Sequence, residues 1–286
     1  MTISEIQSTY PNAVWFDKNY SGTESGTFAQ PYNTFSEAHT NVSDGGVIAV
    51  KAGTHQDELT GMSTKDLTIV GTGHDSILQK NQTAGFSFII SRNVTFLDLT
   101  LKSTFSGTSG SFLVVNGTSG STLVTLRGCK CVNTGSTFDG FLSGLNNGSG
   151  DLSVSNCIFE VQGSHADRGV VLRSWSAGSF GDVTIDGCTI KLTGGSSANF
   201  LGFQKYSTST YTIKNTIFVG NTGSETLMAS TSGQLGTLVD SNNCYSNTGH
   251  SGGTDNIFQD PQFVDSASSD YRLRPTSPCI GAATAS

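Results

Sequence analysis

A short apolar pattern recurs along most of the chain at nearly constant spacing. Each copy alternates apolar and small or polar residues, as in residues 124–129 (VTLRGC) and 183–188 (VTIDGC). The copies begin at residues 67, 94, 124, 152, 183, 211 and 237, so successive copies lie 27, 30, 28, 31, 28 and 26 residues apart. Alternation with a period of two predicts strands, and a constant longer period predicts a stack of repeated units.

A repeat of this length is too short for a four-stranded propeller blade and lacks the helical stretch of a leucine-rich repeat. It fits one coil of a parallel β-helix, in which each turn adds one strand to each parallel sheet. The sequence therefore predicts an all-β protein, a single right-handed parallel β-helix (solenoid) of about seven to nine coils. Thr34 followed by Glu37 predicts a short N-terminal helix over residues 35–41. One continuous domain is expected, with an N-terminal cap and first coil (1–60), the coils (61–248) and an irregular C-terminal cap (249–286).

Turn-forming residues follow the first strand of each copy and are expected to stack at one corner of the coils. The sharp bend there requires left-handed backbone φ and ψ angles. They are Asp98, Gly128, Asn156, Gly187, Asn215 and Ser241. The next position is expected to point inward: Leu99, Cys129, Cys157, Cys188, Thr216 and Asn242. A second inward column is expected to hold Cys131 and Cys244 together with Leu101, Phe159, Ile190 and Phe218. This placement predicts cysteines that pack as buried thiols, and the sequence has no CxxC or HxH spacing that would favour a metal site.

A second strand in each coil is apolar without alternation, which is typical of a strand covered on both faces. The side chains on one face of this strand fill the interior of the coil, and those on the other face need a further layer that covers them. One hypothesis is that the protein forms a homo-oligomer, most simply a trimer, in which a neighbouring subunit buries an outer column of these strands. The equal alternative is that the chain's own loops or C-terminal tail cover this column. The column consists of Leu113, Leu142, Val171, Leu201 and Met228.

The two ends of the sequence resemble a known group. Residues 26–38 (GTFAQPYNTFSEA) and 45–54 (GGVIAVKAGT) resemble the opening of right-handed parallel β-helix proteins of the pectate lyase-like superfamily. Residues 260–265 (DPQFVD), 270–273 (DYRL) and 277–281 (SPCIG) resemble the closing segment of many such proteins. The resemblance covers nearly the whole chain and implies the fold. It implies no single function, because that scaffold carries lyases, hydrolases, epimerases, viral tailspikes and adhesins.

Two catalytic patterns of that superfamily are missing from the sequence. The adjacent Asp pair with His-Gly and Arg-x-Lys strings, typical of polygalacturonase-like members, does not occur. A Ca²⁺ site beside a basic residue needs several acidic ligands on one sheet face. The outward positions of the first sheet are instead mainly hydroxyl residues, with at most one acid per coil; they are Thr95, Thr125, Ser153, Thr184 and Thr212. The charged neighbours Arg127, Asp186 and Lys214 also make this column unsuited to ordering ice-like water.

The strongest remaining cluster surrounds the second strand of the middle coils. Aromatic rings beside charged groups suit a sugar, whose ring stacks on the aromatics while its hydroxyls take the polar partners. The predicted carbohydrate-binding residues are Arg173, Trp175, Lys205 and Tyr206. If the protein is an enzyme, Asp139, Asp167 and Arg168 are its candidate catalytic residues, the two acids acting as a carboxylate pair. Solvated loop residues joined by a surface salt bridge are the alternative interpretation.

Charge and hydropathy restrict the partners that the protein can bind. A net charge of −7 with only 15 Lys and Arg disfavours nucleic acid as a partner. No apolar window is long enough to span a membrane. No cofactor or metal is predicted; Ca²⁺ held by Asp255, Asp260, Asp265 and Asp270 is a weak possibility, since these acids also fit turns.

The predicted function is a structural and adhesive protein, a bacteriophage virion component such as a tail, fibre or capsid decoration, that binds surface glycans without turnover. The first residues lack a basic and apolar leader, which favours synthesis in a host cytoplasm and location in the virion with other virion proteins. A secreted protein whose leader was removed is the alternative location. The alternative function is a polysaccharide lyase or glycoside hydrolase that acts on an acidic polysaccharide.

Overall fold

A computed structural model describes residues 1–56, 64–81, 85–104, 110–115, 122–134, 141–144, 150–161, 169–174, 180–192, 199–203, 210–221, 223, 225, 227–230 and 237–283. At some strand positions next to the gaps, among them Arg173, Leu201 and Met228, only the backbone is described. Within these residues no helix is long and apolar enough to cross a membrane.

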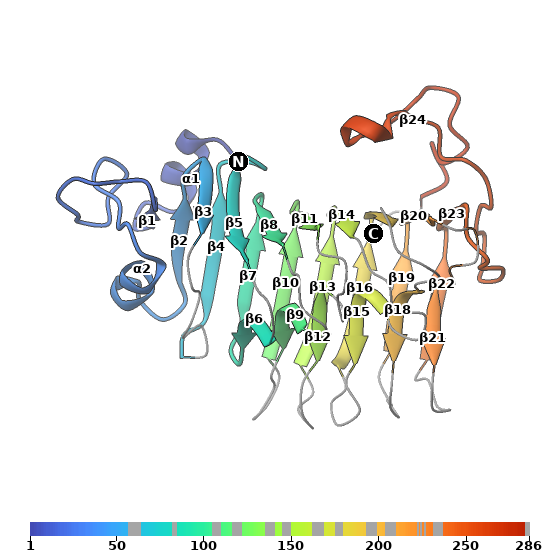
Figure 1. The fold of residues 1–286 in the computed structure, drawn as a ribbon, viewed down its shortest axis with the longest axis horizontal. Coiled ribbons are helices and arrows are strands. Elements are labelled where there is room, and N and C mark those ends of the chain that lie inside the picture. The colour runs from blue at the N-terminus through green and yellow to red at the C-terminus, as the bar shows by residue number, and fades with distance from the viewer. Residues whose placement is uncertain are drawn as a thin grey trace.

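Three parallel sheets run the length of the molecule side by side (Figure 1). The nine-stranded sheet contains β1 (Val14–Phe16), β2 (Gly46–Val50), β4 (Leu67–Gly71), β7 (Val94–Leu97), β10 (Thr122–Arg127), β13 (Gly150–Ser155), β16 (Phe180–Asp186), β19 (Thr210–Lys214) and β22 (Thr237–Ser241). The eight-stranded sheet contains β3 (Gly53–Gln56), β5 (Ser76–Lys80), β8 (Thr100–Ser103), β11 (Lys130–Asn133), β14 (Ile158–Val161), β17 (Thr189–Leu192), β20 (Ile217–Val219) and β23 (Cys244–Ser246). The six-stranded sheet contains β6 (Gly85–Ile90), β9 (Gly110–Val115), β12 (Leu142–Gly144), β15 (Gly169–Ser174), β18 (Asn199–Phe203) and β21 (Met228–Ser230).

Each strand pairs in parallel with the strand about one repeat away in sequence, which confirms the predicted parallel β-helix. In the nine-stranded sheet, Val124 pairs with Val94 on one side and with Leu152 on the other, as the repeat predicts. Six coils contribute a described strand to all three sheets. That is fewer than the seven to nine coils expected, because the first and last coils lack a third strand among the described residues.

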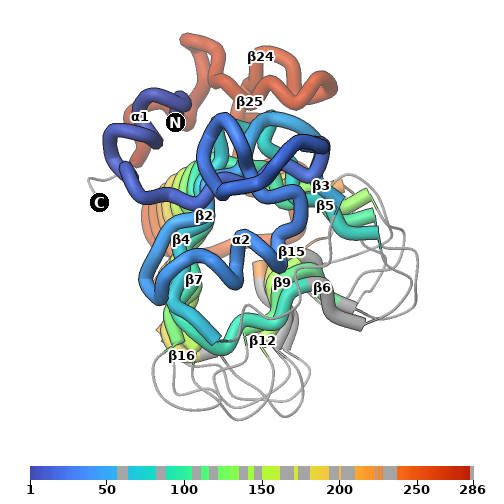
Figure 2. Tube along the Cα trace, turned by 90° about the vertical axis from the view of Figure 1, so that its left-hand side faces the viewer, coloured from blue at the N-terminus to red at the C-terminus, as the bar shows by residue number. Residues whose placement is uncertain are grey.

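Two short helices lie at the N-terminal end. α2 (Phe35–Asn41) confirms the predicted helix: the Thr34 hydroxyl accepts the Glu37 N–H at 3.2 Å, and Phe35 and Ala38 are buried in the core of the coils. In the view along the stack, α2 lies across the end of the first coil (Figure 2). α1 (Ile3–Thr9) was not predicted, although Thr2 and Glu5 form a complete capping box before it.

One corner of the coils is built from left-handed residues, as predicted. Positive φ angles of 47–65° occur at Asp98, Gly128, Asn156, Gly187 and Asn215. In the last coil the corner residue is Asn242, with φ 55°, and the prediction of Ser241 is wrong by one position. A Cβ at Gly187 would lie 2.8 Å from Asn156 Oδ1, so glycine leaves room for the neighbouring side chain as well as allowing the bend.

The residue after each corner points into the core. Leu99, Cys129, Cys157, Cys188 and Thr216 are at most 2% exposed. In the last coil this position is Asn243 and not Asn242, since Thr216 N–H donates to Asn243 Oδ1 at 2.8 Å. In this column a side chain thus accepts a hydrogen bond from a backbone N–H of the preceding coil. Cys129 N–H donates to Cys157 Sγ at 3.4 Å in the same way.

The second inward column is confirmed except at its end. Leu101, Cys131, Phe159, Ile190 and Phe218 pair in register and are completely buried. The residue that pairs with Phe218 is Tyr245, and the two rings stack at 5.0 Å. The placement of Cys244 in this column is therefore wrong, because Cys244 pairs with Ile217.

Three residues of the predicted outer apolar column are described with their side chains, and they are not exposed. Leu113, Leu142 and Val171 are completely buried within the single chain, and all three belong to its hydrophobic core. These three side chains are covered by the chain itself, which was the alternative to an oligomer, and the oligomer stays a prediction. The register also differs by one residue, because Leu172, and not Val171, pairs with Leu142 and with Leu201. The side chains of Leu201 and Met228 lie outside the described part of the structure.

Candidate functional site

Most of the residues predicted to bind sugar or to catalyse lie outside the described residues. These are Asp139, Asp167, Arg168, Trp175, Lys205 and Tyr206. Arg173 is placed by its backbone alone, in β15, where it pairs with Ser143 and Gly202. The described surface carries another arrangement of groups that a ligand could use.

A row of hydroxyl side chains crosses the outer face of the nine-stranded sheet. It follows the strand register without interruption, because Thr95 pairs with Thr68 and Thr125, and Thr184 pairs with Ser153 and Thr212. The predicted outward positions are confirmed: each side chain is partly exposed, while its neighbours on both sides in the strand point inward, as Val183 and Ile185 do. We name the set Thr68, Thr95, Thr125, Ser153, Thr184 and Thr212 the hydroxyl row.

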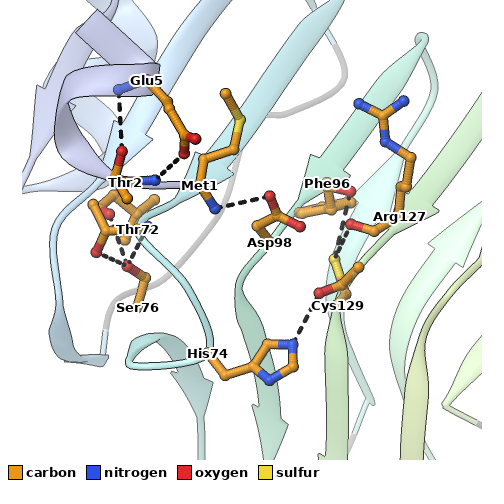
Figure 3. Close-up of polar contacts among 12 residues, drawn as sticks. Met1, Thr2, Glu5, Thr72, His74, Ser76, Phe96, Asp98, Arg127 and Cys129 are labelled. Atoms are coloured by element: carbon orange, nitrogen blue, oxygen red, sulfur yellow. Dashed lines mark hydrogen bonds and ion pairs between the residues drawn. The ribbon is translucent and has the colours of Figure 1, made fainter.

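Charged residues lie two positions further along the same strands. Asp186 Oδ2 lies 3.5 Å from Lys214 Nζ, and Asp186 Oδ1 accepts from Asn215 Nδ2 at 2.8 Å. Arg127 occupies the equivalent position in β10 and is exposed. Its guanidinium extends away from the polar contacts of the corner (Figure 3). The hydroxyl row is thus bordered by a column that carries both signs of charge.

The corner beside this column is closed by local contacts (Figure 3). Asp98 Oδ2 accepts from the amino group of Met1 at 2.9 Å, and His74 Nε2 lies 2.9 Å from the carbonyl oxygen of Gly128. The first contact joins the N-terminal residue to the corner, and the second joins residues two coils apart, so these polar atoms serve the fold.

Acidic and amide residues before the strands also have structural roles. Asp66 Oδ1 accepts the Asn93 N–H at 3.1 Å, and Asn93 Oδ1 accepts the Leu123 N–H at 2.8 Å. Asp151 and Asp182 repeat this bond further along the sheet. Each side chain satisfies a backbone donor of the next coil that would otherwise lack a partner.

The C-terminal segment folds back along the outer face of the eight-stranded sheet (Figure 1). It forms an antiparallel pair, β24 (Phe263–Asp265) and β25 (Asp270–Leu273), joined by the 3₁₀ helix η1 (Ser266–Ser268). Tyr271 donates to Glu160 Oε1 at 2.7 Å, and Lys130 Nζ lies 3.0 Å from Glu160 Oε2. Lys191 donates to the Ser266 carbonyl oxygen at 2.8 Å. The segment is thus attached to β14 and β17, and Lys130 of β11 pairs with the same Glu160 carboxylate.

Three of the four acids considered as Ca²⁺ ligands form hydrogen bonds or an ion pair with residues two or three positions away in their own segment. Asp260 accepts the Gln262 N–H, and Asp265 accepts the N–H groups of Ala267 and Ser268. Asp270 forms an ion pair of 2.6 Å with Arg272. Among the residues that the structure describes, no group of three or more His, Cys, Asp or Glu side chains is arranged to hold a metal ion.

Acid is expected to weaken the attachment of the C-terminal segment at Glu160. Burial alone would raise the pKa of Glu160, but hydrogen bonds from Ser269, Tyr271 and Lys130 outweigh it and lower the pKa below the usual value of a glutamate. A carboxyl group with a lowered pKa in the folded state stabilises the fold fully above its unfolded-state pKa. That contribution is lost as the pH falls through the lower folded-state pKa. Urea unfolding between pH 7 and pH 3 should therefore show a smaller decline of stability for Glu160→Gln than for the wild type, and equal declines would contradict the assignment.

A buried carboxylate organises the last coil. Asp240 Oδ1 accepts from Asn243 Nδ2 at 2.7 Å and from the Tyr245 hydroxyl at 2.8 Å. Asp240 Oδ2 lies 3.0 Å from both His250 Nε2 and Asn256 Nδ2. Burial opposes the charge of Asp240, but these four hydrogen bonds outweigh it and lower the pKa of Asp240. The network joins β22 to the segment that closes the C-terminal end.

The fold and its surface define a parallel β-helix protein with a hydroxyl row on its widest sheet. No protein-family model matches the chain. A search of the curated proteins gave no match either.

Proposed function

We propose that the protein is a structural and adhesive component of a phage virion that binds surface glycans without turning them over. The observation that carries this proposal is the hydroxyl row. Its members are fixed by backbone pairing and are spaced one strand apart, about 4.8 Å. A rigid, repeating set of hydrogen-bonding groups suits a polymer whose own hydroxyl groups repeat.

The border of the hydroxyl row favours a glycan with negative charge. Arg127 is exposed, and a guanidinium group binds carboxylates and sulfates through paired hydrogen bonds. Asp186 and Lys214 already neutralise one another in part, so Arg127 is the natural contact for an acidic sugar. We place the glycan along the hydroxyl row on this side of the sheet.

The virion assignment is supported by the cysteines and by the resemblance of both chain ends to a scaffold that viral tailspikes use. Cys129, Cys131, Cys157 and Cys188 are free thiols at most 2% exposed. Buried free thiols are typical of proteins made in a reducing cytoplasm. Antibodies against the protein are expected to label phage particles in electron micrographs, and labelling of cells alone would contradict the assignment.

A polysaccharide panel tests the glycan proposal. Bacterial and plant polysaccharides, acidic and neutral, are incubated with the purified protein and assayed for bound protein, new reducing ends and unsaturated product absorbing in the ultraviolet. Binding to an acidic polysaccharide without product is the expected result. Product formation would overturn binding without turnover and would make Asp139, Asp167 and Arg168 the first residues to replace.

Variants then locate the site. Thr125→Val combined with Thr184→Val removes two hydroxyls without changing the shape of the row, and the affinity is expected to fall on the order of tenfold or more. Thr189→Val is the matched control, because Thr189 is a partly exposed threonine on the outer face of a different sheet. If Trp175→Ala abolishes binding and the double variant does not affect it, the glycan binds at the sequence-predicted cluster and not on the hydroxyl row.

A further inference from the structure

Two cysteines meet where the C-terminal segment covers the last coil. Cys244 is the first residue of β23, and Cys279 follows β25 in the closing turn. Both line one cavity of about 200 Å³, together with Ile217, Ile257 and Leu273. Cys244 is 3% exposed, and its thiol donates to the Gln259 carbonyl oxygen at 3.5 Å. The segment that carries Cys279 thus forms the outer wall over Cys244.

The two thiols face the same cavity and differ in chemical character. The interaction between the two side chains, together with burial, raises the pKa of Cys244. The same interaction and a hydrogen bond from Ser277 lower the pKa of Cys279. Cys279 is also partly exposed. It is therefore the member of the pair that an external reagent reaches and that loses its proton more readily.

We propose that Cys244 and Cys279 form an intramolecular disulfide when the protein meets a low-molecular-weight disulfide such as oxidised glutathione. The Cys279 thiolate attacks one sulfur of the small disulfide, forms a mixed disulfide and expels one small thiolate. Cys244 loses its proton to solvent, and its sulfur attacks Cys279 Sγ and expels the second small thiolate. The two protein thiols are oxidised by two electrons, and one small disulfide is reduced to two small thiols.

The other described cysteines do not share this environment. Cys129, Cys157 and Cys188 also stack on one another, but they lie inside the coils and are at most 2% exposed. The hydrogen bond to Cys157 and burial raise the pKa of Cys129, and burial raises the pKa of Cys131. Raised pKa values and enclosure make these thiols unreactive toward an external disulfide. The reaction is therefore selective for the C-terminal pair.

The bond would connect the last coil covalently to the segment that covers it. At present that segment is held by polar contacts such as the Tyr271 bond to Glu160. A disulfide from Cys244 to Cys279 closes a loop of about 35 residues, which removes conformational freedom from the unfolded chain and raises thermal stability. This inference is independent of glycan binding.

The test uses the full chain, purified with reductant, desalted and incubated with oxidised glutathione. Unreacted thiols are alkylated after denaturation, and the intact mass and the peptide map are recorded. Two thiols are expected to disappear and four to remain, with one cross-linked peptide pair containing Cys244 and Cys279, out of the six cysteines of the chain. The thermal midpoint should rise by several degrees and return on addition of dithiothreitol.

Variants make the outcome decisive. Cys279→Ser and Cys244→Ser should each abolish the cross-link and the rise of the thermal midpoint, while Cys157→Ser, which removes a thiol from the inner column, should keep both. Six free thiols after oxidation, a lasting mixed disulfide at Cys279, or a cross-link between any other pair would each overturn the proposal.

Discussion

Replacing Phe159 with alanine is expected to lower the free energy of unfolding by about 3–5 kcal/mol. Phe159 is completely buried, between Cys131 and Ile190 of the neighbouring coils, and its ring contacts that of Phe141 edge to face at 6.0 Å. The coils on both sides are fixed by backbone pairing, so they cannot close over the cavity that the smaller side chain leaves. Urea unfolding followed by circular dichroism measures the loss.

The neighbouring residue provides the control for this prediction. Ile158 lies on the same strand but points outward and is partly exposed. Ile158→Ala removes apolar atoms without opening a cavity, and we expect it to cost below about 1.5 kcal/mol. Equal losses for the two variants would show that the column containing Phe159 is not the core of this coil.

Replacing Asp240 with alanine is expected to cost at least about 3 kcal/mol, because four donors lose a charged acceptor at once. Two of them, from Asn243 and Tyr245, are buried. Since the backbone of each coil pairs with that of its neighbours and this network lies in the last coil, the damage should begin at the C-terminal end. Hydrogen exchange followed by mass spectrometry should show early loss of protection in β22 and β23, before the middle coils.

Asp186→Ala is the matched control for the Asp240 variant. Asp186 is a carboxylate on the outer face of the same sheet, where it contacts Lys214 and Asn215 while partly exposed to water. Exposed ion pairs contribute at most about 1 kcal/mol. A cost for Asp240→Ala no larger than that of Asp186→Ala would mean that the buried network does not hold the last coil together.

The regular part of the fold could be predicted because a single physical rule repeats in every coil. A strand with alternating apolar residues must turn its apolar side inward, and a left-handed corner must carry glycine or a residue that tolerates positive φ. Asn156 and Gly187 satisfy the corner rule, and Val183 and Ile185 satisfy the strand rule. These two rules were enough to place the first strand of most coils and the inward cysteines correctly.

The last coil departs from this rule, which explains the errors there. Its inward position opposite Ile213 carries Asp240, a residue that an apolar pattern assigns to the surface. The four hydrogen bonds that make its burial possible come from residues 243–256, and no local pattern predicts them. The expected alignment begins one residue too early, at Thr237 instead of Leu238, and it therefore misplaces Ser241, Asn242 and Cys244 by one position.

The surface was less predictable than the core, for a related reason. Strands that are apolar on both faces indicate two covered faces, but not whether the same chain or another covers them. Leu113 and Leu142 are covered by their own chain. The proximity of Cys244 and Cys279 was equally hidden, because it depends on how the C-terminal segment folds back over 35 residues of sequence, from 244 to 279.

The corner of the coils bears on how a protein of this kind could change in length. Asp98, Gly128, Asn156, Gly187 and Asn215 alternate between a polar side chain and glycine, and the carboxamide of Asn156 fills the space that Gly187 leaves open. The alternation runs from Asp98 to Asn215 and ends there, because the next corner residue, Asn242, is again an asparagine. Within the alternating stretch, a duplicated or deleted pair of coils would preserve the alternation, whereas a single coil would not. Gene duplication within that stretch should therefore favour steps of two repeats.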